Sequence, residues 1–436
     1  MTTVAQCVEV HRLAVAGREP AIAQDVGDRV ARVWLRKSRF ADVEALANAT
    51  LTLGPDAGAI YDLGRAQSST GHPRKALASF ERALHLYREA GHRGNEAACL
   101  TNIGAVYDGL GDRVQALTYY EQALPINREV GNRAGEGVTL NNIGLVYDNL
   151  GDWERALDYY EQALAFKREV EDRAGEGITF NNIGSVYNRL EDWERALDYY
   201  EQALASMREV GDRAGEGTAL NNIGGVYDTL GDRVQALACF EQALSISREV
   251  GDRAGEGITL NNIGSMYDTL EDRERALACF EQALSISREV GDRAGEARTL
   301  NNIGRAYSEL GDRERALAYH EQALPVRRDV GDRVGEATTL NNIGLLYVKL
   351  GDREQALTCY EQALEIIREI GDRANEAVTR YNIGMLHQAK GNLDQAIGEL
   401  EIVVDLDLQV SDPDLASDTA MLERLREERA EARKAT

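Results

Sequence analysis

The chain has 436 residues and carries 73 acidic against 49 basic side chains, a formal net charge of −24. A field of this sign repels nucleic acid and anionic membrane surfaces, so we expect neither as a partner and favour a protein or peptide segment, basic or neutral. Because no run approaches the roughly 18 apolar residues of a membrane span and no signal peptide opens the chain, a cytoplasmic protein is expected.

Residues 1–55 are predicted to form an N-terminal cap. A helix is expected around residues 4–16, and residues 30–55 read as one degenerate helical hairpin. Trp34 would belong to its core, and Pro55 would stop it, since proline cannot continue a helix. The terminal units of a repeat array are usually atypical, which agrees with a capping role.

Residues 56–410 align with themselves in rows of forty without a gap, which makes nine repeats. Such a period indicates an architecture in which each unit stacks on its neighbours. We therefore predict an all-α fold, a right-handed superhelical solenoid of antiparallel helix hairpins. One column is glycine in every repeat: Gly64, Gly104, Gly144, Gly184, Gly224, Gly264, Gly304, Gly344 and Gly384.

Each repeat is predicted to hold two helices. Leu140, Ile143 and Tyr147 recur at three- and four-residue spacing, and a second set with the same spacing follows after a break. The break contains Gly151 and Asp152, where glycine suits a left-handed helix end and aspartate caps the next helix. The glycine column would let the two helices approach closely, with tyrosine filling the space between them.

Residues 411–436 are predicted to form a C-terminal capping helix. Asp412 would cap it and Pro413 would occupy its first turn. Leu422 and Leu425 would face the array, while the charged outer face suits a terminal lid.

The sequence N-I-G-x-x-Y, then G-D, then A-L-x-Y-Y-E-Q-A-L, found in residues 142–164, resembles the tetratricopeptide repeat family, and the resemblance covers about four-fifths of the chain. The forty-residue period is longer than the usual 34. It is similar to the variant found in kinesin light chains, Pins-type adaptors and bacterial signalling arrays. The resemblance implies a concave groove, lined by the first helices, that binds a protein segment.

Two asparagine columns are the strongest candidates for the binding site. Because Ile143 and Tyr147 pack into the hairpin, Asn141 falls on another face of the first helix, which in the family is the groove. An amide both donates and accepts hydrogen bonds, so a row of amides could hold an extended peptide backbone. The alternative is that the Asn142 column forms bonds between helices. The candidate residues are Asn141, Asn181, Asn221, Asn261, Asn301 and Asn341, with Asn142, Asn182, Asn222 and Asn262 beside them.

An acidic band formed by Asp148, Asp228 and Asp268 lies two turns further along the same face. It would attract lysine or arginine of a basic partner, or it is an ordinary solvated face of an acidic protein. Arg305 also belongs to this face, but the face is too poor in basic residues for the carboxylate clamp known in the family. The column of Leu145 varies between repeats, which indicates either binding specificity or drift at exposed sites.

Catalytic and metal sites find little support. His320 and His387 replace aromatic residues at core columns, so packing is the expected role of both. Cys239 and Cys279 share a column on neighbouring second helices, about 8–10 Å apart, which is too far for a disulfide. No CxxC pair suggests a zinc site, and no cofactor motif is present.

Three functions are compatible with these features. The first is a scaffold or adaptor that binds an extended or helical peptide segment in the concave groove. The second is a regulatory sensor arm that controls a separately encoded signalling ATPase, kinase or transcription factor. The third, an enzyme acting on a partner's phosphate, lacks a constellation of residues to support it.

Overall fold

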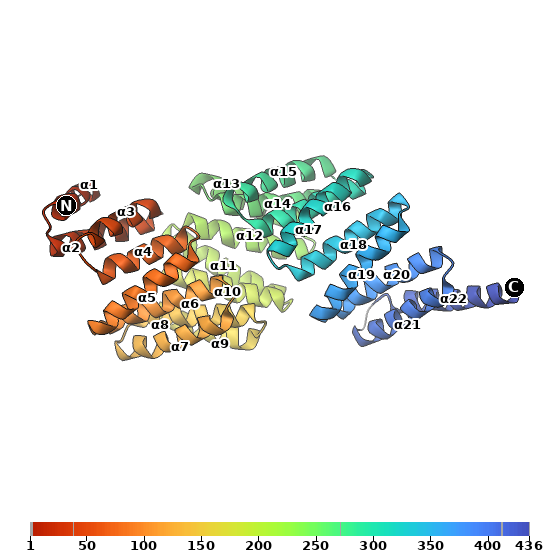
Figure 1. Ribbon diagram of the computed structural model, residues 1–436, viewed down its shortest axis with the longest axis horizontal. Coiled ribbons are helices and arrows are strands. Elements are labelled where there is room, and N and C mark those ends of the chain that lie inside the picture. Colours follow the sequence, from red (N-terminus) through yellow and green to blue (C-terminus); the bar gives the residue numbers. More distant parts are fainter. Residues whose placement is uncertain (1–2, 38, 271, 411–412, 436) are drawn as a thin grey trace. The chain divides into compact units, whose positions relative to one another are not determined.

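The computed structural model describes residues 3–37, 39–270, 272–410 and 413–435, which form twenty-two helices and no strand (Figure 1). Contacts divide the chain into two units, Met1–Asn222 and Ile223–Thr436. Within each unit, consecutive helix pairs pack in a solenoid-like array, so the all-α repeat fold predicted from the sequence is confirmed.

Three helices precede the repeats: α1 (Val4–Ala16), α2 (Pro20–Arg36) and α3 (Phe40–Leu51). The first of these lies where the sequence predicts it. The degenerate hairpin, however, begins ten residues earlier than the predicted residue 30, because Pro20 at the first helical position starts α2. Ala23, Val30 and Trp34 are buried along one side of α2, so the whole of this helix contributes to the N-terminal core.

The repeats follow as alternating first and second helices. The first helices are α4 (Ala57–Ser69), α6 (Arg93–Gly109), α8 (Arg133–Asn149), α10 (Arg173–Arg189), α12 (Arg213–Thr229), α14 (Arg253–Thr269), α16 (Arg293–Glu309), α18 (Arg333–Leu350) and α20 (Arg373–Ala389). The second helices are α5 (Pro73–Glu89), α7 (Arg113–Glu129), α9 (Trp153–Glu169), α11 (Trp193–Val210), α13 (Arg233–Val250), α15 (Arg273–Val290), α17 (Arg313–Asp329), α19 (Arg353–Ile370) and α21 (Leu393–Val410).

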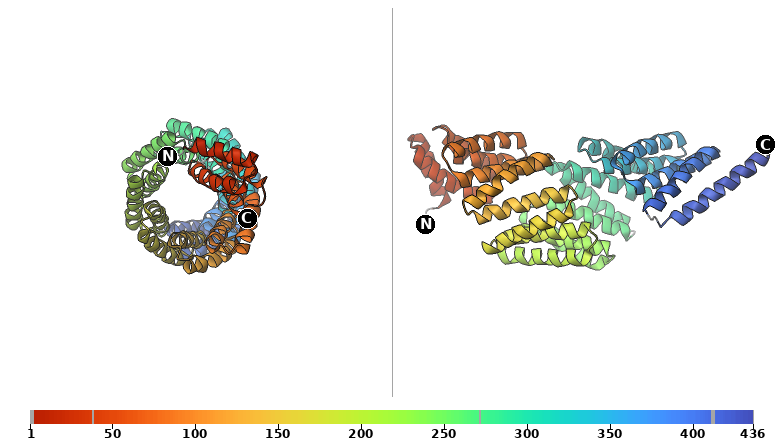
Figure 2. Two further views of the ribbon diagram at one scale, coloured as in Figure 1. Left: turned by 90° about the vertical axis from the view of Figure 1, so that its left-hand side faces the viewer. Right: turned by 90° about the horizontal axis from the view of Figure 1, so that it is seen from below.

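The first helices of neighbouring pairs also touch one another. In the first unit this holds for α4, α6, α8 and α10, and in the second unit for α14, α16 and α18 (Figures 1 and 2). Among the described residues, the second helices have no contact of this extent with each other. Each row of pairs therefore curves toward its first helices, which places them on the concave side of their own unit.

The breaks between helices have the predicted chemistry. Gly151 has φ = 77°, and the Asp152 side chain accepts a hydrogen bond from the Arg155 backbone N–H at 3.2 Å. At two of the breaks within the described residues a glutamate occupies the glycine position: Glu171 has φ = 56° and Glu191 has φ = 60°. A side chain in this left-handed conformation costs about 1–2 kcal/mol, so these two breaks are strained relative to the others.

The glycine column sets the distance between the two helices of each pair. A Cβ atom added at Gly144 would lie 2.8 Å from the Tyr160 ring, inside the contact distance of carbon atoms. The same contact recurs sixteen residues along in every repeat, against Phe80, Tyr120, Tyr160, Tyr200, Phe240, Phe280, His320, Tyr360 and Leu400. Only glycine lets the first helix lie directly on this buried side chain.

His320 occupies the aromatic position in one of these contacts. Its side chain is 1% exposed and its Nδ1 has no hydrogen-bond partner, as expected of a packed residue rather than a metal ligand or base. Burial lowers the pKa of His320 to about 4. His387, by contrast, is only half-buried.

The last helix, α22 (Leu415–Ala435), packs on α21 through the buried Leu422 and Leu425. It begins two residues after Pro413, which lies in a turn, so the prediction that this proline occupies the first helical turn is wrong. Asp412, the predicted cap, falls outside the described residues.

We predict that two adjacent glycines of α12 respond oppositely to alanine. At Gly224 the new Cβ would lie 2.8 Å from Phe240 and 3.2 Å from the Ala236 carbonyl oxygen, so Gly224→Ala should cost about 1–3 kcal/mol through overpacking. At Gly225 nothing lies within 4 Å, so Gly225→Ala should stabilise by up to about 1 kcal/mol through helix propensity. Urea unfolding measures both, and equal effects would contradict the role of the glycine column.

A second prediction concerns acid stability. The unfolded chain protonates His320 near pH 6.5, whereas the folded chain resists protonation down to about pH 4. The stability that depends on neutral His320 is therefore complete above pH 6.5 and is lost as the pH falls toward 4. At about 1.4 kcal/mol per pKa unit, the loss between pH 7 and pH 5 is about 2 kcal/mol. His320→Tyr, which restores the ring found in Tyr360, should remove this part of the pH dependence in urea unfolding. An unchanged difference between pH 7 and pH 5 would refute the assignment.

Candidate functional site

The predicted binding residues lie on one side of the first helices, which we name the first-helix face. It comprises the columns of Val138, Asn141, Leu145 and Asp148, which follow each other at three- and four-residue spacing on α8. Since Ile143 and Gly144 are buried toward the second helix, this face points away from it. The face therefore lies on the concave side of each unit.

The Asn141 column is engaged within the array. Asn141 is 7% exposed, and its Oδ1 accepts hydrogen bonds from Thr179 Oγ1 at 2.9 Å and from Asn182 Nδ2 at 3.4 Å, both in the next repeat. The amides thus link neighbouring repeats. Bonding between helices was the alternative predicted for the Asn142 column, to which Asn182 belongs.

The same link recurs in both units. Asn261 Oδ1 accepts from Thr299 at 3.2 Å and from Asn302 at 3.1 Å. The other contacts are Asn222 to Asn181 at 2.8 Å, Asn342 to Asn301 at 3.2 Å, Thr339 to Asn301 at 3.5 Å, and Asn341 to Thr379 at 2.9 Å, while Asn221 and Asn262 also have partners. A threonine stands 38 residues after each of these asparagines except Asn181, which is followed by Ala219, and this signal was not recognised in the sequence.

One link extends into a buried lysine. Lys167, 4% exposed, donates to Thr179 Oγ1 at 2.7 Å and to the Gly175 carbonyl at 2.9 Å. Burial, opposed by the charge of Asp172, lowers the pKa of Lys167 to about 8. Its ammonium group serves the junction between α9 and α10.

The acidic band is largely neutralised by arginines. Asp148, 3% exposed, pairs with Arg189 of the next repeat at 2.7 Å. Asp268 pairs with Arg305 at 3.0 Å, so the basic residue predicted on this face is there, but its charge is already compensated. Asp228 is exposed. Burial raises the pKa of Asp148, and the nearby Arg189 charge opposes this shift.

Several apolar side chains of the face are exposed to solvent. Val138 is 44% exposed, Ile178 48%, Ile258 40% and Val378 55%, all in one column that holds glycine, alanine, threonine or arginine in the other repeats. Sequence reasoning named the neighbouring Leu145 column but not this one. Because the asparagines lie deeper, a partner would meet these apolar residues first.

A network of glutamates and arginines, also missed from the sequence, joins the pairs. Glu256, 7% exposed, accepts from Arg248 Nε at 2.8 Å and from Arg253, whose second nitrogen reaches Glu289 at 2.7 Å. Burial would raise the pKa of Glu256, but the hydrogen bonds from both arginines outweigh it and hold this pKa below its ordinary value. The equivalent buried residues are Glu96, Glu136, Glu176, Glu216, Glu296 and Glu336.

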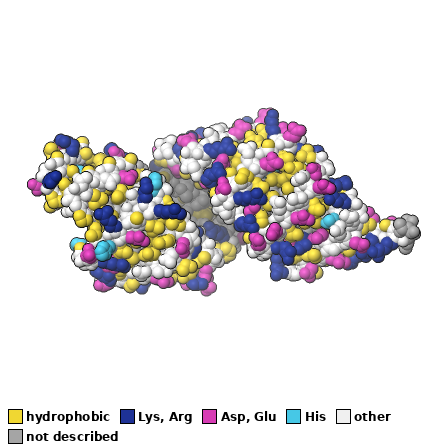
Figure 3. Space-filling view, viewed as in Figure 1, with side chains coloured by type: hydrophobic (Ala, Val, Ile, Leu, Met, Phe, Trp, Pro, Cys, Tyr) yellow, Lys and Arg dark blue, Asp and Glu magenta, His cyan; other side chains and the backbone are white. Residues whose placement is uncertain are grey.

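This network accounts for the mixed charge of the surface. Figure 3 shows basic and acidic side chains interspersed on the visible face of each unit, not separated into large fields. Such pairing confines much of the electrostatic field to short range, so the net charge alone overstates the attraction for a basic partner.

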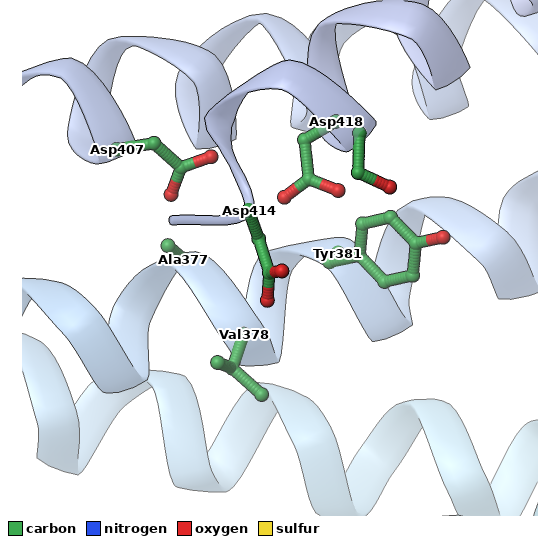
Figure 4. Close-up of a pocket in the computed structure, with 7 residues that line it drawn as sticks. Ala377, Val378, Tyr381, Asp407, Asp414 and Asp418 are labelled. Atoms are coloured by element: carbon green, nitrogen blue, oxygen red, sulfur yellow. The ribbon is translucent and has the colours of Figure 1, made fainter. Parts of the chain in front are cut away.

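A pocket of about 290 Å³ lies in the second unit between α20, α21 and α22 (Figure 4). Tyr381, which stands at the position of Asn141 in the last repeat, forms one wall, and Asp414 and Asp418 lie beside it. Among the described residues, no group of three histidine, cysteine, aspartate or glutamate side chains could hold a metal ion. In the same part of the chain, none of the helices combines the length and apolarity that crossing a membrane requires.

The stacked pairs, joined by repeated polar links, define a helical-repeat protein. A model of the tetratricopeptide repeat matches residues 56–129, 96–169, 176–249, 255–329 and 335–407, well over half of the chain. The chain belongs to the tetratricopeptide repeat family. This family is typically a non-catalytic protein-interaction module, and no catalytic family is indicated.

Solved structures similar to this chain are distant from it in sequence. A signal transduction ATPase with numerous domains (STAND) and a tetratricopeptide repeat sensor, from Pyrococcus horikoshii, has 14% identity and a TM-score of 0.60, covering 85% of this chain and 54% of its own. The apo form of RapI has 18% identity and a TM-score of 0.50, covering 63% and 99%. BtubC (BKLC) from P. vanneervenii has 23% identity and a TM-score of 0.45, covering 50% and 92%. No curated protein matches the sequence.

We predict that the asparagine links differ in strength with their number of bonds. Asn261→Ala removes the acceptor of two hydrogen bonds from buried or half-buried donors and should cost about 1–3 kcal/mol. In the Asn181 link, Ala219 stands where other repeats have threonine, so Asn181→Ala, which removes the bond from Asn222, should cost about half as much. Thermal unfolding of both variants checks the order. The reverse order would contradict a structural role of these links.

Proposed function

We propose that the protein is an interaction scaffold or adaptor that binds an extended or helical segment of a partner protein on the first-helix face. The observation that supports it best is a difference between the residue columns of this face. Columns that are uniform between repeats, such as Asn141, are bonded inside the array, whereas the exposed Val138 column and the mostly half-buried Leu145 column change from repeat to repeat. Varied apolar side chains on a concave, repetitive surface suit recognition of one particular sequence.

The asparagine columns and the acidic band remain part of this proposal as the floor of the groove. An amide N–H not used between repeats could donate to a partner backbone, as in strand or helix recognition. Asp228, which is exposed, could receive a lysine or arginine of a basic partner. Because Asp148 and Asp268 already have arginine partners, apolar contacts would supply most of the affinity.

A regulatory sensor arm is the second candidate. The fold of the Pyrococcus horikoshii ATPase with its tetratricopeptide repeat sensor supports it, although that likeness shows the fold alone. In this case the array would bind a ligand and control a separately encoded ATPase, kinase or transcription factor. Small-angle scattering distinguishes the two: a sensor should change its dimensions when its ligand binds, whereas a passive scaffold should not.

The test compares variants of the full chain against a partner obtained by capture from the native lysate. Val138→Asp with Ile178→Asp should weaken binding about tenfold or more, because two apolar contacts are replaced by charges that must be desolvated. Val114→Asp, at a residue 73% exposed on α7, is the matched control and should bind normally. All three residues are exposed, so melting temperatures should change little.

A second variant tests the asparagines directly. Asn181, Asn221 and Asn261 changed together to alanine should lower the melting temperature, because inter-repeat bonds are lost. If affinity falls only in proportion to folding, the amides are structural, and if it falls further they also contact the partner. Unchanged affinity in both the apolar pair and this triple variant would reject the first-helix face as the binding site.

A further inference from the structure

Four helix pairs contain the same stack of two tyrosines, one from each helix. Tyr147 of α8 and Tyr159 of α9 have ring centroids 5.5 Å apart and an interplanar angle of 6°. The other three pairs, with centroids 5.5–5.6 Å apart and angles of 9–12°, are Tyr107 with Tyr119, Tyr187 with Tyr199, and Tyr307 with Tyr319.

In three pairs of the second unit the second tyrosine is replaced by cysteine. Cys239, Cys279 and Cys359 stand at the position of Tyr159, twelve residues after Tyr227, Tyr267 and Tyr347. No aromatic ring among the described residues stacks on these three tyrosines. Both the tyrosines and the cysteines are half-buried, so these positions open to solvent.

The surroundings of the stack are suited to a phenol. In the filled pairs a glutamate of the preceding second helix lies near the second tyrosine, as Glu121 does near Tyr159 and Glu281 near Tyr319. One of the cysteine pairs keeps this carboxylate, since Glu321 lies beside both Tyr347 and Cys359, whereas the charge near Cys279 is that of Arg248. A carboxylate beside this position, although exposed, favours a ring that carries a hydrogen-bond donor.

We propose that the first-helix tyrosines Tyr227, Tyr267 and Tyr347 bind tyrosine side chains of a protein partner, each ring taking the place that Tyr159 holds in its own pair. The four filled pairs show which ring this position accepts. Tyr267 packs toward the second helix, so this site is separate from the first-helix face. Each of these sites is formed within one helix pair, so the proposal does not rest on the proposed groove.

Disulfide tethering tests the proposal on the intact chain, because each site contains its own thiol. The protein is equilibrated with equal amounts of two disulfide reagents, one carrying a 4-hydroxyphenethyl group and the other a cyclohexylethyl group, in excess mild reductant. Cys279 exchanges with either reagent to form a mixed disulfide and releases the reagent's second thiol. Peptide mass mapping gives the phenol-to-cyclohexyl ratio at each cysteine.

The phenol adduct should exceed the cyclohexyl adduct about threefold or more at Cys239, Cys279 and Cys359, the factor that a stacked aromatic pair supplies. At Cys7, a half-buried cysteine outside the repeats, the ratio should be near one. Tyr267→Ala should reduce the ratio at Cys279 to that of Cys7 and leave Cys359 unchanged. Equal ratios at all four cysteines, or no adduct at Cys279, would overturn the proposal.

Cys279→Tyr gives an independent result. If the position accepts a phenol, this variant should fold with a higher melting temperature, since it completes the stack found in Tyr307 and Tyr319. A lower melting temperature would mean that the position cannot hold the ring and would overturn the proposal without reference to any reagent.

Discussion

The structure depends on the close approach of two helices across a glycine. At Gly144 a single methyl group would overlap the Tyr160 ring, and the same is true of the equivalent residues in every repeat. This contact fixes the distance and register of each pair, since an aromatic ring can lie against the first-helix backbone at only one height. A pair held this way still exposes apolar residues on both sides. Stacking in series buries them, which is why the fold is an array and not a set of independent hairpins.

Polar links then fix how one pair lies on the next. Buried polar groups are normally hydrogen-bonded. Asn141 accepts a hydrogen bond from Thr179 across one junction between pairs, and Glu256 accepts one from Arg248 across another. Each bond contributes only about 0.5–1.5 kcal/mol net, but leaving one partner unsatisfied costs more, so the links penalise any shifted register. An apolar junction alone would tolerate such shifts. The buried acidic residues at the junctions are therefore structural, whereas exposed ones such as Asp228 can reach a partner.

The sequence predicted the fold more completely than the site. A forty-residue period, the glycine column and the Gly-Asp breaks define helix pairs by local chemistry, so α4 to α21 follow from the sequence alone. The predicted helix boundaries were wrong at the two ends of the chain. Pro20 and Pro413 lie outside the repeats, so no equivalent residue was there for comparison. The face of Asn141 followed from helix periodicity, but its partners Thr179 and Asn182 did not. They lie 38 and 41 residues away, a spacing that becomes meaningful only when the stacking of two first helices is known.

Uniformity and variation along the array separate structure from recognition. Residues that bond to the neighbouring repeat must be nearly the same in every copy, because each is both donor and acceptor in a chain of identical junctions. An exposed residue has no such constraint, so the Val138 column can change between apolar, hydroxyl and arginine side chains without cost to folding. Cysteine at the position equivalent to Tyr159, found in three pairs of the second unit, is a third kind of variation. It removes an internal partner at a half-buried position while the ring of Tyr267 and the thiol of Cys279 stay in the hydrophobic cluster around Phe240. Such a change loses packing energy inside the pair. The proposed binding of a partner's tyrosine ring would recover that energy.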